Sequence, residues 1–194
     1  MTDVPTAPRR SDALRNRERV IAAAREVFAE RGIDACVPEV ARRAGVGKAT
    51  VYRSFPTREH LVAAVVVHRL EWFEACARDG LADPDPAAGL AAFMLGAARR
   101  AAADRSLSEA IALVSEMPGV IEAQTRVRTA LGALLRAAQD AGAVRDDVGV
   151  HDVKLLLSGV CGALGADASE AALRRAMTLA LDALRPGGRT LPAA

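Results

Sequence analysis

Residues 48–58 bring together basic and hydroxyl-bearing side chains that are suited to noncovalent binding of a nucleic acid. Lysine and arginine neutralise phosphates and bind guanine edges, and threonine and tyrosine hydroxyls bind phosphate oxygens. A small side chain among them allows close approach to the bases and contact with a thymine methyl group. The residues that we predict to contact double-stranded DNA are Lys48, Ala49, Thr50, Tyr52, Arg53, Thr57 and Arg58.

Two short helices separated by a glycine-containing turn must position these side chains. The sequence predicts the first helix over residues 37–44 and the second over residues 47–54, with Gly45 between them. This is the pattern of a helix-turn-helix, whose second helix enters the major groove of DNA. Val51 and Phe55 are four residues apart, so we expect both to point into the protein while the polar residues of this helix face DNA.

Helical periodicity continues along most of the chain. The predicted helices cover residues 12–31, 37–44, 47–54, 57–79, 87–103, 107–116, 120–141, 151–166 and 169–184. From them we predict a disordered basic arm (1–11), a helix-turn-helix domain (12–56), a connecting helix (57–79), a helical regulatory and dimerisation domain (80–186) and a disordered tail (187–194).

The composition favours an all-α protein. Hydrophobic residues make up 51% of the 194 residues and aromatic residues only 3%, so Ala, Leu and Val must form most of the core. Alanine is the strongest helix former, and strand-forming residues are comparatively few. Residues 1–60 hold 12 Lys and Arg against 8 Asp and Glu, whereas the rest of the chain holds 14 against 16. The basic N-terminal part therefore indicates an anionic partner.

The sequence argues against an enzyme, a metalloprotein and a membrane protein. It contains no nucleophile elbow, phosphate-binding loop or Cys-His-acid set, and its three cysteines are far apart. His68, Trp72 and Cys76 would share one helix face, but no carboxylate or second histidine is in step with them to complete a metal site. No signal peptide or membrane span is apparent, so we expect a cytoplasmic protein that uses no cofactor and contacts no membrane.

Residues 17–67 resemble the N-terminal domain of the TetR family of bacterial repressors. The resemblance rests on the segments RVIAAA (19–24), FAERG (28–32), VARRAGV (40–46), KATVYRSFP (48–56) and REHL (58–61). It continues in register from segment to segment and includes a Tyr-x-x-Phe-Pro signature, which makes it far more specific than a bare helix-turn-helix. It implies a three-helix DNA-binding domain followed by a helical domain that dimerises and usually encloses a small-molecule pocket.

Two residues depart from the pattern of this family. Cys36 stands where the family commonly has Ser or Thr, and Gly47 replaces a usual Ser before Lys48. A serine or threonine at a helix N-cap stabilises the helix by about 1 kcal/mol, so Cys36 weakens this cap and removes one expected phosphate contact. The arm residues Arg9, Arg10, Arg15 and Arg17 have two readings, as an ordinary solvated start or as contacts to the minor groove or backbone.

The C-terminal half offers candidates for a ligand pocket, each with a simpler alternative. Apolar residues that could line the pocket are Trp72, Phe73, Cys76, Phe93, Met94 and Met117. For any one of them we favour plain core packing. Arg99 and Arg100 could meet an acidic ligand, although a solvated helix face is the favoured interpretation.

The last two predicted helices are candidates for a dimer interface. Their apolar stripes include Val153, Leu157, Val160, Leu173, Met177 and Leu181. A strip of small residues accompanies them, formed by Ser158, Gly159, Gly162, Ala163 and Ala166. The family resemblance implies that these helices form a four-helix bundle across the dimer axis, and close packing within one subunit is the alternative.

The sequence therefore supports two hypotheses about function. The first is a homodimeric repressor that a small-molecule effector releases from its DNA operator. The alternative is a DNA-binding regulator without a small-molecule switch, controlled by its abundance or by a partner protein.

Overall fold

The computed structural model describes residues 10–103, 106–164, 169–187 and 190–192. Within these ranges the chain forms nine α-helices and no strand, as the composition predicts. The helices are α1 (Arg10–Arg31), α2 (Val37–Ala44), α3 (Lys48–Ser54), α4 (Arg58–Leu81), α5 (Pro86–Ala103), α6 (Ser106–Val114), α7 (Pro118–Asp140), α8 (Val150–Leu164) and α9 (Glu170–Ala183).

The predicted and observed helices differ only near their ends. Helix α1 begins at Arg10 rather than Asp12, so the last two residues of the predicted arm belong to a helix. Residues 1–9 of that arm lie outside the described residues, as does Ala166 at the end of the helix predicted over 151–166. Helix α4 continues to Leu81, beyond the predicted end at residue 79.

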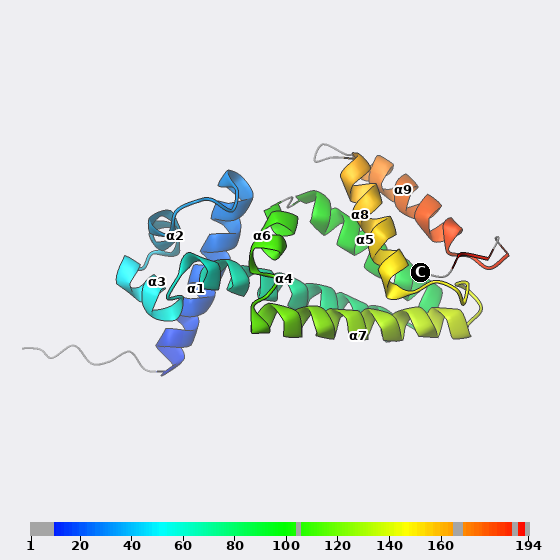
Figure 1. The fold of residues 1–194 in the computed structure, drawn as a ribbon, viewed down its shortest axis with the longest axis horizontal. Helices are drawn as coiled ribbons and strands as arrows, with labels where there is room; N and C mark the ends of the chain where they lie inside the picture. The colour runs from blue at the N-terminus through cyan, green and yellow to red at the C-terminus, as the bar shows by residue number, and fades with distance from the viewer. Residues whose placement is uncertain (1–9, 104–105, 165–168, 188–189, 193–194) are drawn as a thin grey trace, which may run out of the picture.

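Helices α1, α2 and α3 and the beginning of α4 form a head at one end of the molecule (Figure 1). The core of the head contains Val27, Val40, Val51 and Leu61, which are fully buried, and the nearly buried Phe55. Each of these residues belongs to an apolar stripe in its own segment, and the stripes of the different helices pack against one another. Burial of these stripes holds α3 at a fixed angle to α1.

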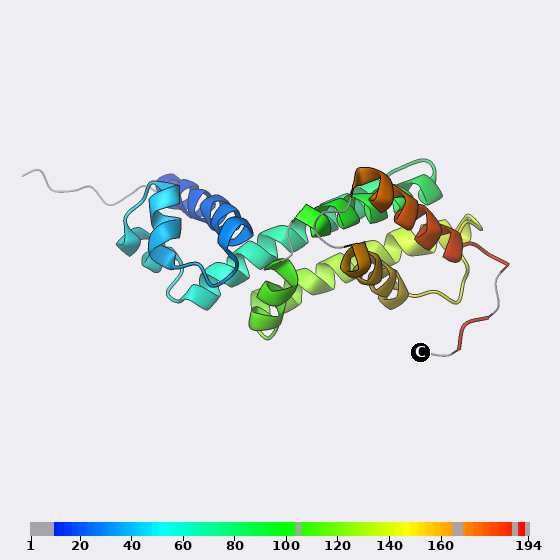
Figure 2. The same cartoon turned by 90° about the horizontal axis from the view of Figure 1, so that it is seen from above.

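The body is built on α4 and α7, which lie side by side along its length (Figure 2). Helix α5 packs against both of them, and α8 and α9 cover α5 at the end distant from the head (Figure 1). The body has its own core, which includes Leu90, Met94, Leu134 and Met177. Because α4 begins in the head and continues through the body, the packing of the body determines how the head is held.

Helices α4 and α5 cross at two glycines, Gly80 and Gly89, where their backbones touch. A Cβ atom placed on Gly89 would lie 2.1 Å from the Gly80 carbonyl oxygen, and one on Gly80 would lie 2.8 Å from the Gly89 carbonyl oxygen. No real side chain tolerates these distances. Glycine at both positions is therefore what permits this crossing.

A buried carboxylate joins α4 to α7. Glu74 is 7% exposed and accepts a hydrogen bond from Arg126 Nε of α7 at 3.0 Å. Arg78, one turn further along α4, approaches the same carboxylate at 2.6 Å. A charged group is buried at low cost only when it is paired and hydrogen-bonded, so this pair specifies how α4 lies against α7.

A second carboxylate joins α5 to α9. Glu170 accepts hydrogen bonds from Arg99 of α5, with Arg99 Nε at 3.1 Å, and from Arg174 Nε of its own helix at 2.7 Å. The Arg99 guanidinium, followed by that of Arg174, lowers the pKa of Glu170 from 4.5 to about 2. The lowered pKa is consistent with a carboxylate that pairs with both arginines in its ionised form.

Part of the predicted disordered tail is attached to the body. The Leu191 backbone N–H donates to Asp147 Oδ2 at 2.9 Å, and Arg145 Nη2 donates to the same oxygen at 2.8 Å. The Arg145 guanidinium and then the Leu191 N–H lower the pKa of Asp147 to about 2. Residue 191 makes this hydrogen bond without belonging to a helix, and residues 188–189 and 193–194 lie outside the described residues. Across the described ranges, no helix combines the length and the apolar character needed to cross a membrane.

Candidate nucleic-acid interface

Gly45 forms the turn between α2 and α3. Its φ of +64° lies in the left-handed region, which glycine adopts without steric cost. The Gly45 N–H donates to the Arg42 carbonyl at 3.2 Å and the Val46 N–H donates to the Ala41 carbonyl at 3.0 Å, so two of the last four carbonyls of α2 are satisfied by the turn. The chain can then start α3 at Lys48 after only three residues that belong to neither helix.

Ion pairs and hydrogen bonds hold α2 against α1. Arg43 donates to both oxygens of Glu30, at 2.9 and 2.6 Å, and also to Glu26 at 3.2 Å. The hydrogen bond from Arg43 lowers the pKa of Glu30. Arg19 Nη2 of α1 donates to the Ala44 carbonyl at the end of α2, at 2.7 Å. Forked pairs of this kind are geometrically specific, so they fix the helix pair that supports α3.

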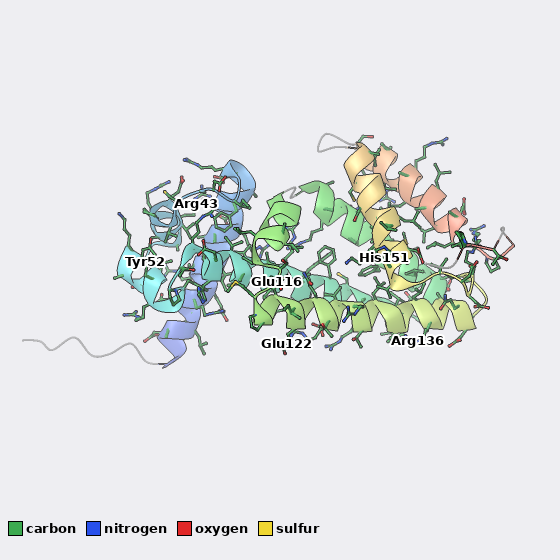
Figure 3. All side chains as sticks on the ribbon, viewed as in Figure 1. Arg43, Tyr52, Glu116, Glu122, Arg136 and His151 are labelled. Carbon is green, nitrogen blue, oxygen red and sulfur yellow. The ribbon has the colours of Figure 1, made fainter. Side chains whose placement is uncertain are left out.

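The two faces of α3 have opposite character, as predicted. Val51 is fully buried and Phe55, just after the helix, is 3% exposed. The other face carries four exposed residues: Lys48, Ala49, Tyr52 and Arg53. Tyr52 is 46% exposed and lies at the outer end of the head, away from the body (Figure 3). This is the placement that a helix needs to enter a DNA groove without obstruction.

The other three predicted DNA contacts lie beside this face and make contacts within the protein. Thr50 is half-buried. Thr57 is the N-cap of α4, and its hydroxyl accepts from the His60 backbone N–H at 3.4 Å. Arg58 donates to the Ile33 carbonyl and, at 3.0 Å, to Asp34. Arg58 therefore braces the loop between α1 and α2, and a phosphate would have to compete with these acceptors.

Two of the arginines named with the arm, Arg15 and Arg17, lie on α1 and contact their neighbours. Arg15 pairs with Asp12 one turn earlier on the same helix. The Arg17 guanidinium carbon lies 5.2 Å from the centre of the Phe55 ring, which is a cation–π contact to the end of α3. Arg17 thus helps to position the recognition helix, a role that the sequence did not indicate.

Neither Cys36 nor Gly47 caps its helix with a side chain. Cys36 is the N-cap of α2 and Gly47 that of α3, and both have extended backbone angles without a side-chain cap hydrogen bond. Cys36 is exposed, so a hydroxyl at this position would not have to displace a packed neighbour. The first turn of α2 therefore lacks one side-chain acceptor that it could have.

We expect Cys36→Ser to stabilise the protein by about 1 kcal/mol, because a serine hydroxyl would give the Glu39 N–H, which now donates to the Cys36 carbonyl at 3.0 Å, a side-chain acceptor as well. Thermal unfolding measures this as a rise in Tm of roughly 3 °C for a chain of this size. Gly47→Ser is the matched control at the next N-cap, where replacing glycine gains only a few tenths of a kcal/mol. Equal shifts for the two variants would show that the cap of α2 is not deficient.

The six residues predicted to line a ligand pocket lie in three different environments. Phe93 and Met94 are buried in the core of the body, and Phe73 and Cys76 pack against that core. Met117 packs against the core of the head. Trp72 lines a groove of about 680 Å³ between α1, α4 and α5. None of the other five residues is part of the lining of this groove. Nor do three His, Cys, Asp or Glu side chains gather for a metal ion within the described ranges.

The residues predicted for the dimer interface divide into two groups. Val153, Leu173 and Met177 are between 0% and 4% exposed, because they attach α8 and α9 to the core of the body. In this chain they face inward, so we expect them to support the outward residues of α8 and α9 rather than to contact a partner directly. Leu157, Val160 and Leu181 are half-buried.

The outward face of α8 and α9 carries different apolar residues. Leu155 is 56% exposed and Leu179 is 61% exposed. Gly159 and Gly162 share this face of α8, and a Cβ atom on either would meet no described atom within 4 Å. Helical periodicity alone did not identify Leu155 and Leu179, because α8 and α9 have apolar residues on both sides.

The groove beside Trp72 is lined by more arginines than the two, Arg99 and Arg100, that the sequence analysis names as candidates for an acidic ligand. Its lining includes Arg25 of α1, Arg69 of α4, and Arg99 and Arg100 of α5. Arg99 is exposed and pairs with Glu170. Arg100 is half-buried, and its guanidinium carbon lies 4.7 Å from the centre of the Trp72 ring.

Comparison with protein families identifies both parts of the chain. Residues 20–65 match the model described as bacterial regulatory proteins, tetR family. Residues 85–186 match the model described as transcriptional regulator SbtR-like, C-terminal domain. The first match covers the head with the candidate interface, and the second covers α5 to α9.

Solved structures of regulators are similar to the chain over nearly its whole length. A TetR transcription regulatory protein from Mycobacterium vanbaalenii has 40% identity and a TM-score of 0.69, with 92% of this chain and 99% of that chain covered. A TetR transcriptional regulator from Streptomyces coelicolor has 33% identity and a TM-score of 0.69, with 89% and 99% covered. RolR in complex with resorcinol shares the fold at 21% identity and a TM-score of 0.60, with 91% and 90% covered. A comparison with curated proteins finds no match.

Proposed function

Because this chain belongs to the TetR family of DNA-binding transcriptional regulators, which are not enzymes, we propose that it is a homodimeric repressor released from its operator by a small-molecule ligand. The observation that carries the proposal is the exposed face of α3 at the outer end of the head, with Lys48, Ala49, Tyr52 and Arg53 free of the protein core. In this proposal the protein acts in the cytoplasm. Residues 12–56 bind DNA, residues 57–79 connect the DNA-binding domain to the rest of the chain, and residues 80–186 form the regulatory and dimerisation domain.

The DNA contacts follow from the chemistry of this face. Lys48 and Arg53 bind phosphates or guanine edges, and the Tyr52 hydroxyl binds a phosphate oxygen. Ala49 allows the backbone of α3 to approach the bases. Thr50, Thr57 and Arg58 flank this face and contact the adjoining phosphates.

A dimer is required because one short recognition helix reads too few base pairs for useful affinity. Two copies of α3, separated by about 34 Å, would enter successive major grooves on one side of the DNA. The outward face of α8 and α9 supports pairing with a second copy, since it exposes Leu155 and Leu179 beside two glycines that permit close approach. Half-buried Leu157, Val160 and Leu181 adjoin this face and would become covered.

We expect Leu155→Glu to weaken dimerisation more than hundredfold. Two leucines per dimer would lose about 1.5–3 kcal/mol each of burial, and two carboxylates would be desolvated. Analytical ultracentrifugation over a concentration series measures the change. Leu113→Glu is the control, because Leu113 is 46% exposed on α6, outside this face. A dimer that tolerates Leu155→Glu as well as Leu113→Glu would place the interface elsewhere.

Release by a ligand would act through α4. A ligand bound in the body would tilt α4 and change the distance between the two copies of α3. DNA and ligand must weaken each other's binding by the same factor. The structure of RolR with resorcinol provides a precedent for a small-molecule complex in this fold.

The direct test is fluorescence anisotropy of labelled DNA from the region upstream of the protein's own gene, across a salt series, with a scrambled duplex as the control. Binding that is specific for the native fragment and weakens steeply with salt is the expected result. Equal, weak binding to both duplexes would count against autoregulation.

A regulator without a ligand switch is the second candidate function. A screen in which no ligand changes either the Tm of the protein or its affinity for DNA would favour this second function.

A further inference from the structure

The groove between the head and the body is unusual in its charge. It has a volume of about 680 Å³, within the range of small-molecule sites. Four guanidinium groups line it, those of Arg25, Arg69, Arg99 and Arg100, against the single carboxylate of Glu26 among the described lining residues. Glu26 in turn is bound by Arg43 at 3.2 Å. The lining therefore holds four guanidinium groups and one carboxylate, of which Arg99 is already paired with Glu170 and Glu26 with Arg43.

The floor and one wall of the groove are held by contacts within the protein. Arg69 is only 4% exposed, and its Nη2 donates to the Arg100 carbonyl at 2.9 Å. The Trp72 indole forms an aromatic wall, with the Arg100 guanidinium carbon 4.7 Å from its ring centre and the Phe73 ring edge-on to it at 5.1 Å. Gly96 leaves space beside the Trp72 indole, because a Cβ atom added at Gly96 would still lie 3.6 Å from Trp72 Cη2.

Arg25 provides a polar group that an anion would satisfy. Its Nε is buried and has no hydrogen-bond acceptor among the described residues. A buried donor without an acceptor costs free energy, and a carboxylate that accepted from a guanidinium would remove that cost. Guanidinium groups bind carboxylates through paired, charge-assisted hydrogen bonds, and an indole face favours a flat apolar ring.

We propose that this groove binds a small aromatic carboxylate, with the carboxylate held by the arginines and the ring placed against Trp72. This proposal names the class of ligand for the ligand-released repressor, and the regulatory role of the groove rests on that proposed function. The walls belong to α1 of the head and to α4 and α5 of the body. A ligand that contacts both parts at once changes the angle between them, and with it the spacing of the two copies of α3.

The chain carries a built-in reporter for this site, because Trp72 is its single tryptophan. The experiment titrates the full-length protein, without DNA, with benzoate and follows tryptophan fluorescence. Benzyl alcohol is the neutral control of equal ring size. We expect a saturable change with benzoate and none with benzyl alcohol.

Two groove variants and one control complete the test. Arg25→Gln removes the charge next to the ring, and Gly96→Leu fills the space in front of it; each is expected to weaken benzoate binding at least tenfold. Arg136→Gln removes an exposed charge on α7, outside the groove (Figure 3), and leaves binding unchanged. Circular dichroism melting of each variant verifies that it is folded.

The outcomes separate this proposal from the function on which it rests. No saturable response to benzoate, an equal response to benzyl alcohol, or full binding by folded Arg25→Gln and Gly96→Leu would overturn the groove as an anion site. DNA anisotropy on the same samples is an independent readout. If the protein binds its operator but not benzoate, the repressor proposal stands and the groove proposal is overturned. If it binds benzoate but no DNA, the groove proposal stands and the repressor proposal is overturned.

Discussion

Replacing Lys48 with alanine is expected to weaken operator binding about hundredfold and to leave folding and dimerisation intact. Lys48 is exposed in the first turn of α3, and no hydrogen bond or ion pair joins its side chain to another described residue. A lost phosphate or base contact costs about 1–3 kcal/mol, and a dimer loses two of them. About 3 kcal/mol in total corresponds to the hundredfold change in Kd.

The salt dependence of binding makes this prediction more specific. Each lost phosphate contact lowers the slope of log K against log salt by about 0.9, so the dimer should lose about 2. Arg136→Ala is the matched control, because it removes one positive charge from the body, far from α3 (Figure 3). If both variants weakened binding equally, overall charge rather than the face of α3 would determine affinity.

Tyr52 extends the same test to a neutral side chain. Tyr52→Phe removes the hydroxyl alone, and Tyr52→Ala removes the ring as well. With 46% of its surface exposed, Tyr52 contributes little to the core of the head. Both variants should weaken DNA binding, the alanine variant more strongly, without a loss of dimer in gel filtration. A shift to monomer would show instead that the head is coupled to the dimer interface.

Replacing Gly89 with alanine is expected to destabilise the protein by about 3 kcal/mol. The new Cβ would lie 2.1 Å from the Gly80 carbonyl oxygen, so α5 must move away from α4. The obstacle is backbone rather than a flexible side chain, and forced overpacking of this kind typically costs 1–3 kcal/mol or somewhat more. Thermal unfolding should show a decrease in Tm of roughly 10 °C.

Gly96→Ala, in the same helix, is the control for Gly89→Ala. Its Cβ would lie 3.6 Å from Trp72 Cη2, which is an ordinary van der Waals distance. Alanine has the higher helix propensity, so this variant should gain up to about 1 kcal/mol. Opposite signs for the two variants identify the α4–α5 crossing as the cause. A Gly89→Ala protein as stable as the original would mean that the crossing can open without cost.

Local sequence patterns were sufficient to predict the helices and the head. Alanine-rich composition, helical spacing of apolar residues and the glycine at position 45 act within a few residues of one another, so their consequences are visible in the chain itself. The burial of Val51 and the exposure of Tyr52 followed from their positions on one short helix. The helices and the two faces of α3 were therefore predicted before any tertiary contact was known.

Other features depended on which helices meet in space. Val153 and Leu155 are both apolar residues of α8, and only packing against the body determines that Val153 is buried and Leu155 exposed. Leu191 lies in a segment without helical pattern, and its attachment depends on Asp147, which is distant in the sequence.

The basic groove is the strongest case of a property that only the tertiary structure decides. Arg25, Arg69 and Arg100 come from three different helices, and nothing in the sequence indicates that Arg25 and Arg69 lie near Arg100. Hydrophobic periodicity determines which face of a helix turns inward, but it carries no information about which other helix lies opposite. Charge that gathers between helices is set by their packing, because side chains distant in the chain interact only after the helices have been brought together.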